Sequence, residues 1–438
     1  MINYLTYAFG CLRGAFIWLL SATCAGLLGP AVPDATYAMA NKAEKYLARA
    51  QILTASTERS YFDKANGVLH NNPSNWFGAS GCWDVTALLT MYTKMAALDK
   101  KYLKDADRAI YALGFYGRET PGGAFSAYTG ERTNRQNASN GDVYYDDNMW
   151  VGRDLVELYR ITGDKKYLDR ASIIADMLIA EGWTDLDEAM FEERFGRAPG
   201  GPLGGFYWRD DHAALHACSN GPAVQFLTLL SQVADNGKGE SYLDYAQRCY
   251  RFLTYLENVG GDWDGVFWDL MRFTKDEDNN ITGIHERAGV PLTYNSGTPI
   301  SSAAALYRVT GDESYLEDAK RWGYHADRYF AKNSPVPGIK AYENGLKTWF
   351  REILLMGFID LYEFDADALG YIENMEGSIN YAYENHRLNG VLGWQRNIFP
   401  KSWVEGFRDE DEMKTQEALA QIPCAGVYAS LAGFYRSL

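Results

Sequence analysis

The sequence predicts an all-α fold, an (α/α)6 toroid of six helical hairpins with a small β-hairpin on the rim of its cleft. Three observations support this fold class. A short signal recurs along the 438-residue chain, at intervals of roughly 55–75 residues, the scale of a repeated helical unit. Helix-periodic apolar segments flank each copy. Short turns alternate with long links, so that the long links would gather on one rim.

The recurring signal places a glycine and an aspartate before a Tyr-Leu pair. It reads Thr162-Gly163-Asp164-Lys165-Lys166-Tyr167-Leu168 and, later, Thr310-Gly311-Asp312-Glu313-Ser314-Tyr315-Leu316. Related copies lie at 98–103 and 239–243, and a degenerate copy lies at 368–372. Glycine tolerates the backbone conformation just past a helix end, and aspartate accepts the first amides of the next helix. Each copy therefore predicts a tight turn between two helices.

Apolar periodicity on either side of these turns predicts twelve helices. We expect them near residues 38–54, 81–97, 100–113, 147–161, 165–181, 220–235, 240–256, 298–310, 312–330, 345–363, 366–386 and 414–436. The long links are 114–146, 182–219, 257–297 and 387–413. Long loops in a compact domain usually carry function. The composition has no linker-like break, so residues 41–438 are expected to form one domain.

The link before the eighth helix has strand-like runs. Val266-Phe267-Trp268 and Ile281-Thr282-Gly283-Ile284 flank the polar tip 276–280, which predicts a β-hairpin on the cleft rim. The acidic tip lacks the glycine at the sixth position and the final glutamate of a calcium-binding loop. It is therefore interpreted as a solvated turn.

The N-terminal segment has the composition of a secretory signal peptide. The stretch from Gly14 to Pro33 carries no charge and follows Arg13. We expect a signal within residues 1–40, no second membrane span, and an exported protein that is secreted, periplasmic or bound at the cell surface. An even number of cysteines then permits two disulfides, although buried free thiols fit a core of this size equally well. They are Cys82, Cys218, Cys249 and Cys424.

The overall composition constrains the partner. A net charge of −15 argues against nucleic acid, which needs a basic surface. The aromatic fraction of 14% exceeds what a core needs, so part of it is expected to line a binding surface. We expect a monomer that binds a polysaccharide or oligosaccharide and needs no cofactor or metal.

The most informative motif is Tyr144-Tyr145-Asp146-Asp147-Asn148-Met149-Trp150. Aromatic rings offer sugars apolar faces, and two carboxyl groups held close together are what glycosidic bond cleavage requires. Consecutive Cβ atoms lie about 5–6 Å apart, close to the ~5–5.5 Å carboxyl separation of retaining glycosidases. The competing interpretation is that the pair only caps a helix, which is common for aspartate. The aromatic frame and the long preceding link favour Asp146 and Asp147 as catalytic residues.

Other polar and aromatic clusters fall just before, or in the first turn of, every second helix. In a toroid such positions converge on one cleft, so we expect them to bind substrate. These candidates are Trp83, Tyr145, Trp208, Asn220, Asp269, Tyr294, Asn295 and Arg351. Trp208 is the preferred stacking platform, with core packing as the alternative. Arg351 has an alternative role as a structural ion-pair partner.

These segments resemble glycoside hydrolase family 76, the endo-α-1,6-mannanases and their fungal wall-remodelling relatives. The resemblance covers most of residues 45–436 and is most specific at 145–150, with further similarity at 219–221, 294–297 and 350–351. It implies a retaining mechanism with Asp146 as nucleophile and Asp147 as general acid/base, acting on internal α-1,6-mannosidic bonds of mannan. The insert at 182–205 and the acidic hairpin depart from the family and leave substrate length and branching open.

Several alternatives stay open at this point. The chain could be a transglycosylase acting on α-mannosyl glycans, a different (α/α)6 enzyme such as a polysaccharide lyase, or a non-catalytic glycan-binding toroid. Asp211, His212, His216 and Cys218 have metal-like spacing. Ordinary polar residues in a rim loop are the competing interpretation, because further convergent ligands are not evident.

Overall fold

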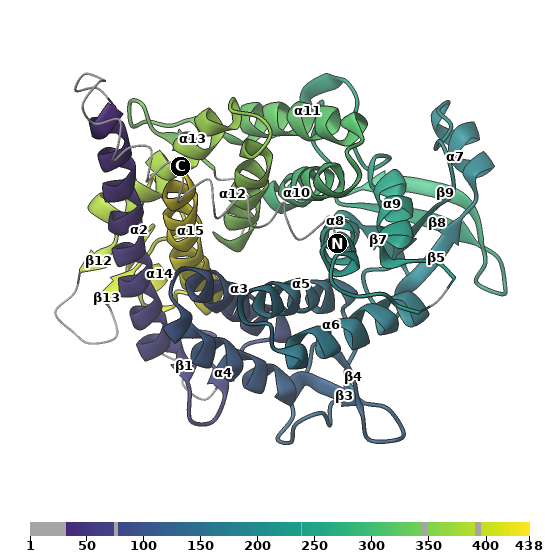
Figure 1. Ribbon diagram of the computed structural model, residues 1–438, viewed down its shortest axis with the longest axis horizontal. Coiled ribbons are helices and arrows are strands. Elements are labelled where there is room, and N and C mark those ends of the chain that lie inside the picture. Colours follow the sequence, from purple (N-terminus) through teal and green to yellow (C-terminus); the bar gives the residue numbers. More distant parts are fainter. Residues whose placement is uncertain (1–31, 74–77, 238, 343–347, 390–395) are drawn as a thin grey trace, which may run out of the picture.

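The computed structural model describes residues 32–73, 78–237, 239–342, 348–389 and 396–438. Its helices form two concentric rings around a central axis (Figure 1). The inner helices are α3 Cys82–Leu98, α5 Tyr145–Thr162, α8 Ala217–Ser231, α10 Thr293–Thr310, α12 Thr348–Tyr362 and α15 Ala418–Ser437. The outer helices are α2 Val32–Tyr61, α4 Leu103–Leu113, α6 Lys165–Met177, α9 Tyr242–Leu253, α11 Glu313–Phe330 and α13 Ala368–Asn385.

Each inner helix packs on the next, and α15 packs on α3, so the inner ring is closed. Five inner helices pack against the outer helix that follows them in the chain. The sixth pair joins the two ends of the chain, because α15 packs against α2. The predicted (α/α)6 toroid is confirmed, and all twelve predicted helices are present.

The recurring glycine-aspartate signal forms the turns that it predicts. Gly163 and Gly311 end α5 and α10 in the left-handed conformation, with φ of 72° and 71°. The following aspartates, Asp164 and Asp312, accept hydrogen bonds from amides in the first turns of α6 and α11. The turn is sharp because glycine adopts positive φ without steric cost.

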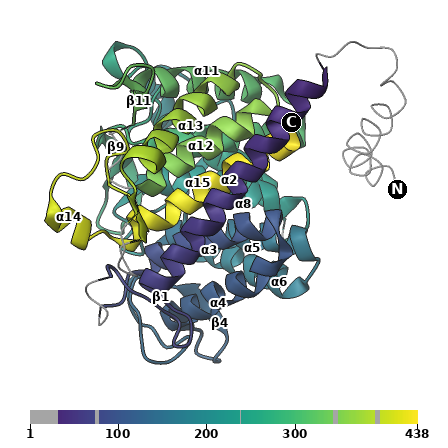
Figure 2. The ribbon, with the colours of Figure 1, turned by 90° about the vertical axis from the view of Figure 1, so that its left-hand side faces the viewer.

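In the described residues, the links that lead from outer to inner helices carry small antiparallel sheets, five of two strands and one of three. The strands are β1 Phe62–Asp63, β2 Val68–Leu69, β3 Gly117–Glu119, β4 Phe125–Tyr128, β5 Trp183–Leu186, β6 Leu203–Phe206, β7 Ala214–His216, β8 Leu270–Lys275, β9 Ile281–Ala288, β10 Lys332–Asn333, β11 Lys340–Ala341, β12 Leu388–Asn389 and β13 Arg396–Ile398. Figure 2 shows β9, β11 and α14 on one side of the ring, with the C-terminus on the other.

The predicted β-hairpin exists, but its first strand was placed too early. Strand β8 begins at Leu270, whereas the apolar run 266–268 contributes Val266 and Phe267 to the core, both fully buried. Strand β9 includes the predicted run 281–284, and β7 adds a third strand. Two short helices escaped prediction: α7 Glu188–Phe195 lies within the insert at 182–205, and α14 Glu410–Lys414 precedes α15.

The predicted leader, residues 1–40, lies largely outside the described residues, and 32–40 form the beginning of α2. No helix in the described part of the chain has the length and apolar character needed to span a membrane. Cys82, Cys218, Cys249 and Cys424 are buried free thiols, so the interpretation as free thiols is confirmed and that as disulfides is wrong.

Candidate active site

The first turns of the inner helices gather aromatic and polar side chains on the side of the ring that carries the sheets. Asp146 and Asp147 are the second and third residues of α5, and each is 6% exposed. The first amide of the helix, that of Tyr145, donates to the carbonyl of Trp208 at 2.9 Å. Two carboxyl groups are thus held in one buried turn, at a helix end that favours negative charge.

Several hydrogen bonds support the carboxylate of Asp146. Trp208 Nε1 donates to Oδ2 at 3.1 Å, and the backbone amide of Asp147 donates to Oδ1 at 3.1 Å. The thiol of Cys218 is a third donor. Burial raises the pKa of Asp146, to about 7, and these donors oppose the rise because they stabilise the charged form.

Asp147 lies in a less favourable environment for charge. Burial raises its pKa well above the ordinary value, and the neighbouring charges of Asp146 and Asp84 raise it further. The thiol of Cys82 opposes this rise. Because two adjacent carboxylates resist double ionisation, the pair holds one proton over a range of pH. The donors around Asp146 favour the state in which Asp146 is ionised and Asp147 is protonated.

Trp208 supports Asp146 from a position beside two other rings. Its ring stacks on His216, with centroids 5.0 Å apart, and meets the ring of Tyr144 edge-on at 5.2 Å. The half-buried indole therefore has one face covered while its N–H is committed to the carboxylate. The stacking role of Trp208 stays a prediction, and the hydrogen bond to Asp146 gives this residue a positioning role as well.

Replacing Trp208 with phenylalanine removes this donor and keeps an aromatic ring. Since the N–H stabilises the ionised form of Asp146, its loss should raise the pKa of Asp146. We expect the acid limb of the pH profile of kcat/KM to move to higher pH. At low pH the activity should fall by about 10-fold or more, given ~1.5–3 kcal/mol for a hydrogen bond to a charged group. An unchanged acid limb would separate Trp208 from the ionisation of Asp146.

Aromatic side chains lie in the first turns of the helices α3, α10 and α12. Trp83 of α3 packs on Trp349 with centroids 4.1 Å apart and remains half-buried. Tyr294 of α10 stacks on Phe350 of α12 at 4.4 Å. Tyr294 also contacts the thiol of Cys218, which in turn reaches Asp146. Tyr294 is thus linked to Asp146 through Cys218, and Trp83 lies in the first turn of the neighbouring inner helix α3; that both bind substrate stays a prediction.

Asp269 and Asn295 form a pair of their own. Asn295 Nδ2 donates to Asp269 Oδ1 at 3.0 Å, and Asp269 Oδ2 lies 3.9 Å from His216 Nδ1. Asn295 is fully buried, whereas the side chain of Asp269 is 24% exposed. Asp269 thus has surface for a ligand, and Asn295 acts by orienting it.

Asn220 is not available to a substrate, contrary to the prediction. Its Oδ1 accepts from the Phe206 amide at 2.8 Å, and its Nδ2 donates to the carbonyls of Phe206 and His216 at 2.9 and 2.8 Å. Both amide hydrogens are used, and the side chain is fully buried. The side chain therefore joins β6 to α8 as a backbone group would.

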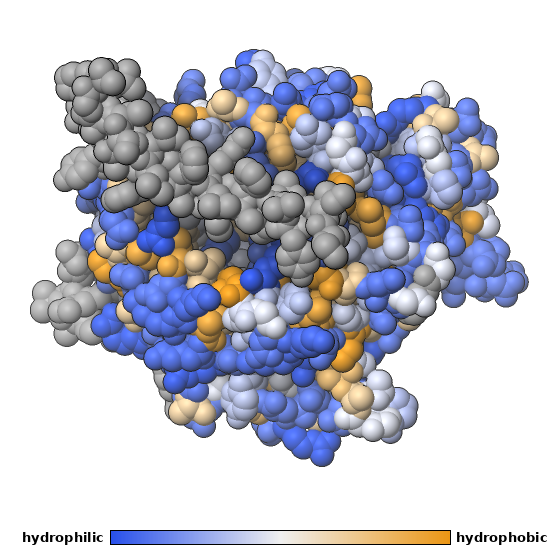
Figure 3. All heavy atoms as spheres, viewed as in Figure 1, coloured by the Kyte–Doolittle hydropathy of each residue, from blue (hydrophilic) through white to orange (hydrophobic). Residues whose placement is uncertain are grey.

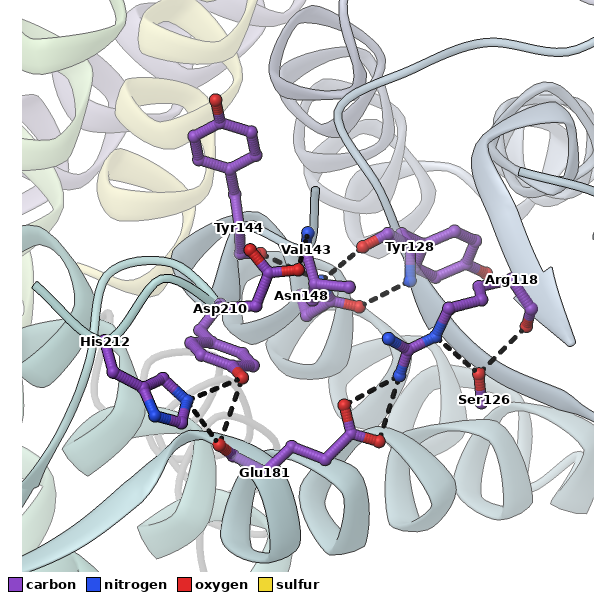
Figure 4. A network of polar contacts seen from close by, with 10 residues as sticks. Arg118, Ser126, Tyr128, Val143, Tyr144, Asn148, Glu181, Asp210 and His212 are labelled. Atoms are coloured by element: carbon purple, nitrogen blue, oxygen red, sulfur yellow. Dashed lines mark hydrogen bonds and ion pairs between the residues drawn. The ribbon is translucent and has the colours of Figure 1, made fainter. Parts of the chain in front are cut away.

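The same arrangement, in which a side-chain amide both accepts from and donates to the backbone of one link residue, recurs at the fourth residue of other inner helices; we call it an amide bracket. Asn148 exchanges two bonds with the backbone of Tyr128, both at 2.8 Å. Gln421 exchanges two with Phe399, at 2.8 and 2.9 Å. Figure 4 shows Asn148 between the link and α5. These amide brackets attach each link to the inner helix that follows it. They therefore also fix the positions of the neighbouring residues in the first turn of that helix.

We expect Asn220→Leu to lower the free energy of unfolding by about 3 kcal/mol, because it leaves buried backbone groups unpaired. Exposed Asn385 makes one side-chain bond, to the carbonyl of Tyr381, and Asn385→Leu serves as the control, with an expected change within ~0.5 kcal/mol. Urea unfolding compares the two. Equal small losses would mean that the bracket does not hold the link.

Tyr145 and Arg351 are also placed away from the role predicted for them. Tyr145 is buried against Gly182, and its hydroxyl donates to the carbonyl of Glu181 at 3.1 Å. Arg351 is buried, donates to the carbonyl of Lys401 at 2.6 Å and lies over the ring of Trp403. Both residues hold the walls of the site and do not line it.

The chain has a second adjacent aspartate pair, Asp210 and Asp211. Asp211 pairs with Arg209, and Asp210 Oδ2 accepts the amide of Val143 at 3.0 Å. This pair lies in the exposed rim loop, where its carboxylates bind neighbouring residues of the protein. It provides an internal control for the buried pair.

The metal interpretation of the same loop is not supported by the geometry. His212 stacks on Tyr207 with centroids 4.5 Å apart, and its Nε2 lies 3.0 Å from the carbonyl of Glu181. His216 stacks instead on Trp208. Among the described residues, no group of three or more ligand-type side chains is arranged to hold a metal ion.

Sequence reasoning missed the two thiols as neighbours of the pair, whereas Asp84 belongs to the first-turn cluster at Trp83 that it expected in the same cleft. Cys82 opens α3 and Cys218 is the second residue of α8, the helices on either side of α5. Asp84 is the third residue of α3, and its charge acts on Asp147. The available signal was position, because all three lie in the first turns of inner helices.

Comparison with known proteins assigns the chain to a family. Residues 39–364 match the profile of glycosyl hydrolase family 76. The sequence matches none of the curated proteins with which it was compared.

Solved structures share the fold at low identity. A family 76 glycoside hydrolase (mannosidase) from Bacteroides thetaiotaomicron VPI-5482 is 23% identical, with a TM-score of 0.68, over 91% of this chain and 99% of that chain. The GH76A α-1,6-mannanase from Salegentibacter sp. HEL1_6 is 20% identical, with a TM-score of 0.63, over 89% and 99%. An inactive variant of the latter, with two adjacent aspartates replaced by asparagine, was solved with α-1,6-mannotriose; it is 19% identical, with a TM-score of 0.64, over 89% and 99%.

Proposed function

Because the chain belongs to glycosyl hydrolase family 76, we propose that it is an exported enzyme that hydrolyses internal α-1,6-mannosidic bonds of mannan with retention of configuration. The observation that carries the proposal is the buried Asp146–Asp147 pair, whose environments favour different protonation states. A glycosidase needs one ionised and one protonated carboxyl group at the scissile bond, and this turn supplies both.

The proposed reaction proceeds in two displacements. Asp146 attacks the anomeric carbon while Asp147 donates its proton to the departing glycosidic oxygen, which leaves a glycosyl ester on Asp146. Asp147, now ionised, takes a proton from water, and that water attacks the same carbon and releases Asp146. The Trp208 N–H holds Asp146 in place throughout.

The choice of substrate rests on two supports. The neighbouring Salegentibacter enzyme is described as an α-1,6-mannanase, and its variant inactivated at adjacent aspartates was solved with α-1,6-mannotriose. In this chain an adjacent pair occupies the first turn of α5, with Trp83 and Tyr294 nearby to contact sugar rings. The uncharged leader-like segment at 14–33 supports export.

Incubation of the purified protein with linear α-1,6-mannan tests the function directly. We expect short manno-oligosaccharides of mixed length at early times, which identifies internal cleavage. Release of mannose alone would contradict an endo-acting enzyme. New, longer products in the presence of excess acceptor sugar would instead assign the glycosyl intermediate to transglycosylation.

A further inference from the structure

A small pocket lies on the flank of the toroid, where the insert at 182–205 meets the β8–β9 hairpin. The insert carries α7, and α7 packs against β9. These are the two segments in which the sequence analysis expects a departure from the family. Figure 1 shows α7 and β9 outside the inner ring, and Figure 3 shows the hydrophilic tip of the hairpin projecting from the same flank. The pocket is therefore built by segments that do not contribute to the aspartate pair.

Two of the residues that line this pocket are arginines. The lining consists of Arg194 and Phe195 from α7 and of Ile284 and Arg287 from β9, and the volume is about 250 Å³. Within the described part of the chain, no carboxyl group lines it. Drug-sized ligands commonly occupy ~300–1,000 Å³. This pocket therefore suits a smaller group that carries negative charge.

The protein holds Arg287 in one orientation. Its Nη1 donates to the carbonyls of Tyr255 and Glu257, at 3.3 and 3.0 Å. Its guanidinium lies over the rings of Phe195 and Trp268, 5.2 and 5.9 Å from their centroids. Nε and Nη2, which carry three of the five N–H groups of an arginine, make no hydrogen bond to a described residue. Neither is among the buried unpaired atoms, so both are accessible to a ligand and already oriented.

Neither arginine of the pocket has a carboxylate partner. In the described chain, Arg194 and Arg287 form no ion pair, and Glu192 and Glu193 of α7 form none with Arg194. Two other nearby carboxylates pair with different arginines, Glu286 with Arg272 and Glu257 with Arg321. The positive charges that line the pocket are therefore not neutralised by the protein.

The two guanidinium groups repel each other. Burial lowers the pKa of Arg287, and the like charge of Arg194 lowers it further. Both groups stay protonated at neutral pH, because arginine titrates far above it. An anion between them would replace this repulsion with two attractions. The chain as a whole has a net charge of −15, so this pocket is a local exception.

The two guanidinium groups match a phosphate better than a carboxylate. A phosphate group carries about −1.5 to −2 charges at neutral pH and three acceptor oxygens. Arginine binds such oxygens with two parallel N–H groups, in a geometry that lysine cannot reproduce. A carboxylate has one charge and two oxygens, so it would satisfy one of the two arginines.

We propose that the pocket between α7 and β9 is a binding site for a phosphate group, free or carried by a sugar. Arg287, which the backbone of the preceding link holds in place, supplies fixed donors. Arg194, exposed in the last turn of α7, supplies the second charge. Phe195 offers a half-buried ring to the molecule that carries the phosphate.

Calorimetry with inorganic phosphate and with mannose 6-phosphate tests the proposal on the full chain. The site variant is Arg194→Gln, which removes one charge from an exposed position and should leave the fold intact. Arg328→Gln is the matched control, because Arg328 is likewise exposed in the last turn of its helix, α11. Crystals soaked with mannose 6-phosphate locate the bound group.

We expect both ligands to bind the parent protein, with the phosphate in the pocket in crystals. Arg194→Gln should weaken binding on the order of 10-fold, because a charged donor is lost. Arg328→Gln should leave it unchanged. No binding to the parent, equal binding to the Arg194→Gln protein, or an equal loss in the control would overturn the proposal.

The two ligands also distinguish the source of the phosphate. Tighter binding of mannose 6-phosphate than of inorganic phosphate would place the phosphate on a sugar, whereas equal affinity would assign the pocket to the free ion; either result supports the site. Neither ligand contains a glycosidic bond. The outcome is therefore independent of the proposed hydrolysis, and a protein inactive on mannan could still bind phosphate here.

Discussion

Asp146→Asn should lower kcat on α-1,6-mannan by about 10⁴-fold or more, because the amide cannot form the glycosyl ester. Asp147→Asn should lower it by about 10²–10⁴-fold, the usual contribution of a general acid. Both side chains are buried and similar in size to asparagine, so the fold should persist. Far-ultraviolet circular dichroism checks this point alongside the rates.

A substrate with a good leaving group distinguishes the two roles. Dinitrophenolate leaves a dinitrophenyl α-mannoside without needing a proton. The Asp147→Asn protein should therefore release it in a burst as the glycosyl ester forms, and should then stall because hydrolysis of the ester needs the missing base. The Asp146→Asn protein should give no burst. Asp211→Asn, in the exposed adjacent pair, is the control and should keep activity within about 3-fold, as expected for a surface ion pair. A burst from Asp146→Asn, or none from Asp147→Asn, would reverse or refute the assignment.

Gly297→Ala should destabilise the protein by about 3 kcal/mol or more. A Cβ at this position would lie 2.6 Å from the carbonyl oxygen of Ile353 and 2.7 Å from the Cα of Leu354, so α10 and α12 would have to separate. Gly357 faces Gly297 from the other helix, with the same close approach. The contact is between backbones, and no side chain can rotate to relieve it.

Gly370→Ala provides the matched control in the exposed part of α13, where a Cβ meets nothing within 4 Å. This change should stabilise the protein by up to about 1 kcal/mol, because alanine favours a helix. Thermal unfolding of both proteins measures the difference. The separation of α10 from α12 should also disturb the Tyr294–Phe350 stack and lower activity. A Gly297→Ala protein as stable as the parent would show that the two helices are not held at this distance.

The sequence predicted the helices well because their turns are local. Gly163 and Asp164 are sufficient to end one helix and begin the next, whatever the rest of the chain does. The hairpin was harder, since Val266 and Phe267 have strand-like character and yet pack into the core. Where a strand begins depends on the strand that it pairs with, and the apolar residues 266–268 alone do not specify that partner.

The sequence predicted in which helix turns the candidate site residues lie, but not which way each of their side chains points. Successive helical residues point about 100° apart, so the first turn of an inner helix sends side chains to the site, to neighbouring helices and to the link. In α5 the second and third residues, Asp146 and Asp147, form the buried pair, while Tyr145 and Asn148 hold the link. In α8 the fourth residue, Asn220, does the same. Residue type alone could not separate these directions.

The most direct test of the central claim is the anomeric form of the first product. Proton NMR of α-1,6-manno-oligosaccharide digestion, read before mutarotation, distinguishes the two stereochemical outcomes. Double displacement through Asp146 predicts that the α-anomer appears first. Initial appearance of the β-anomer would contradict a glycosyl ester on Asp146 and would require a single displacement by water.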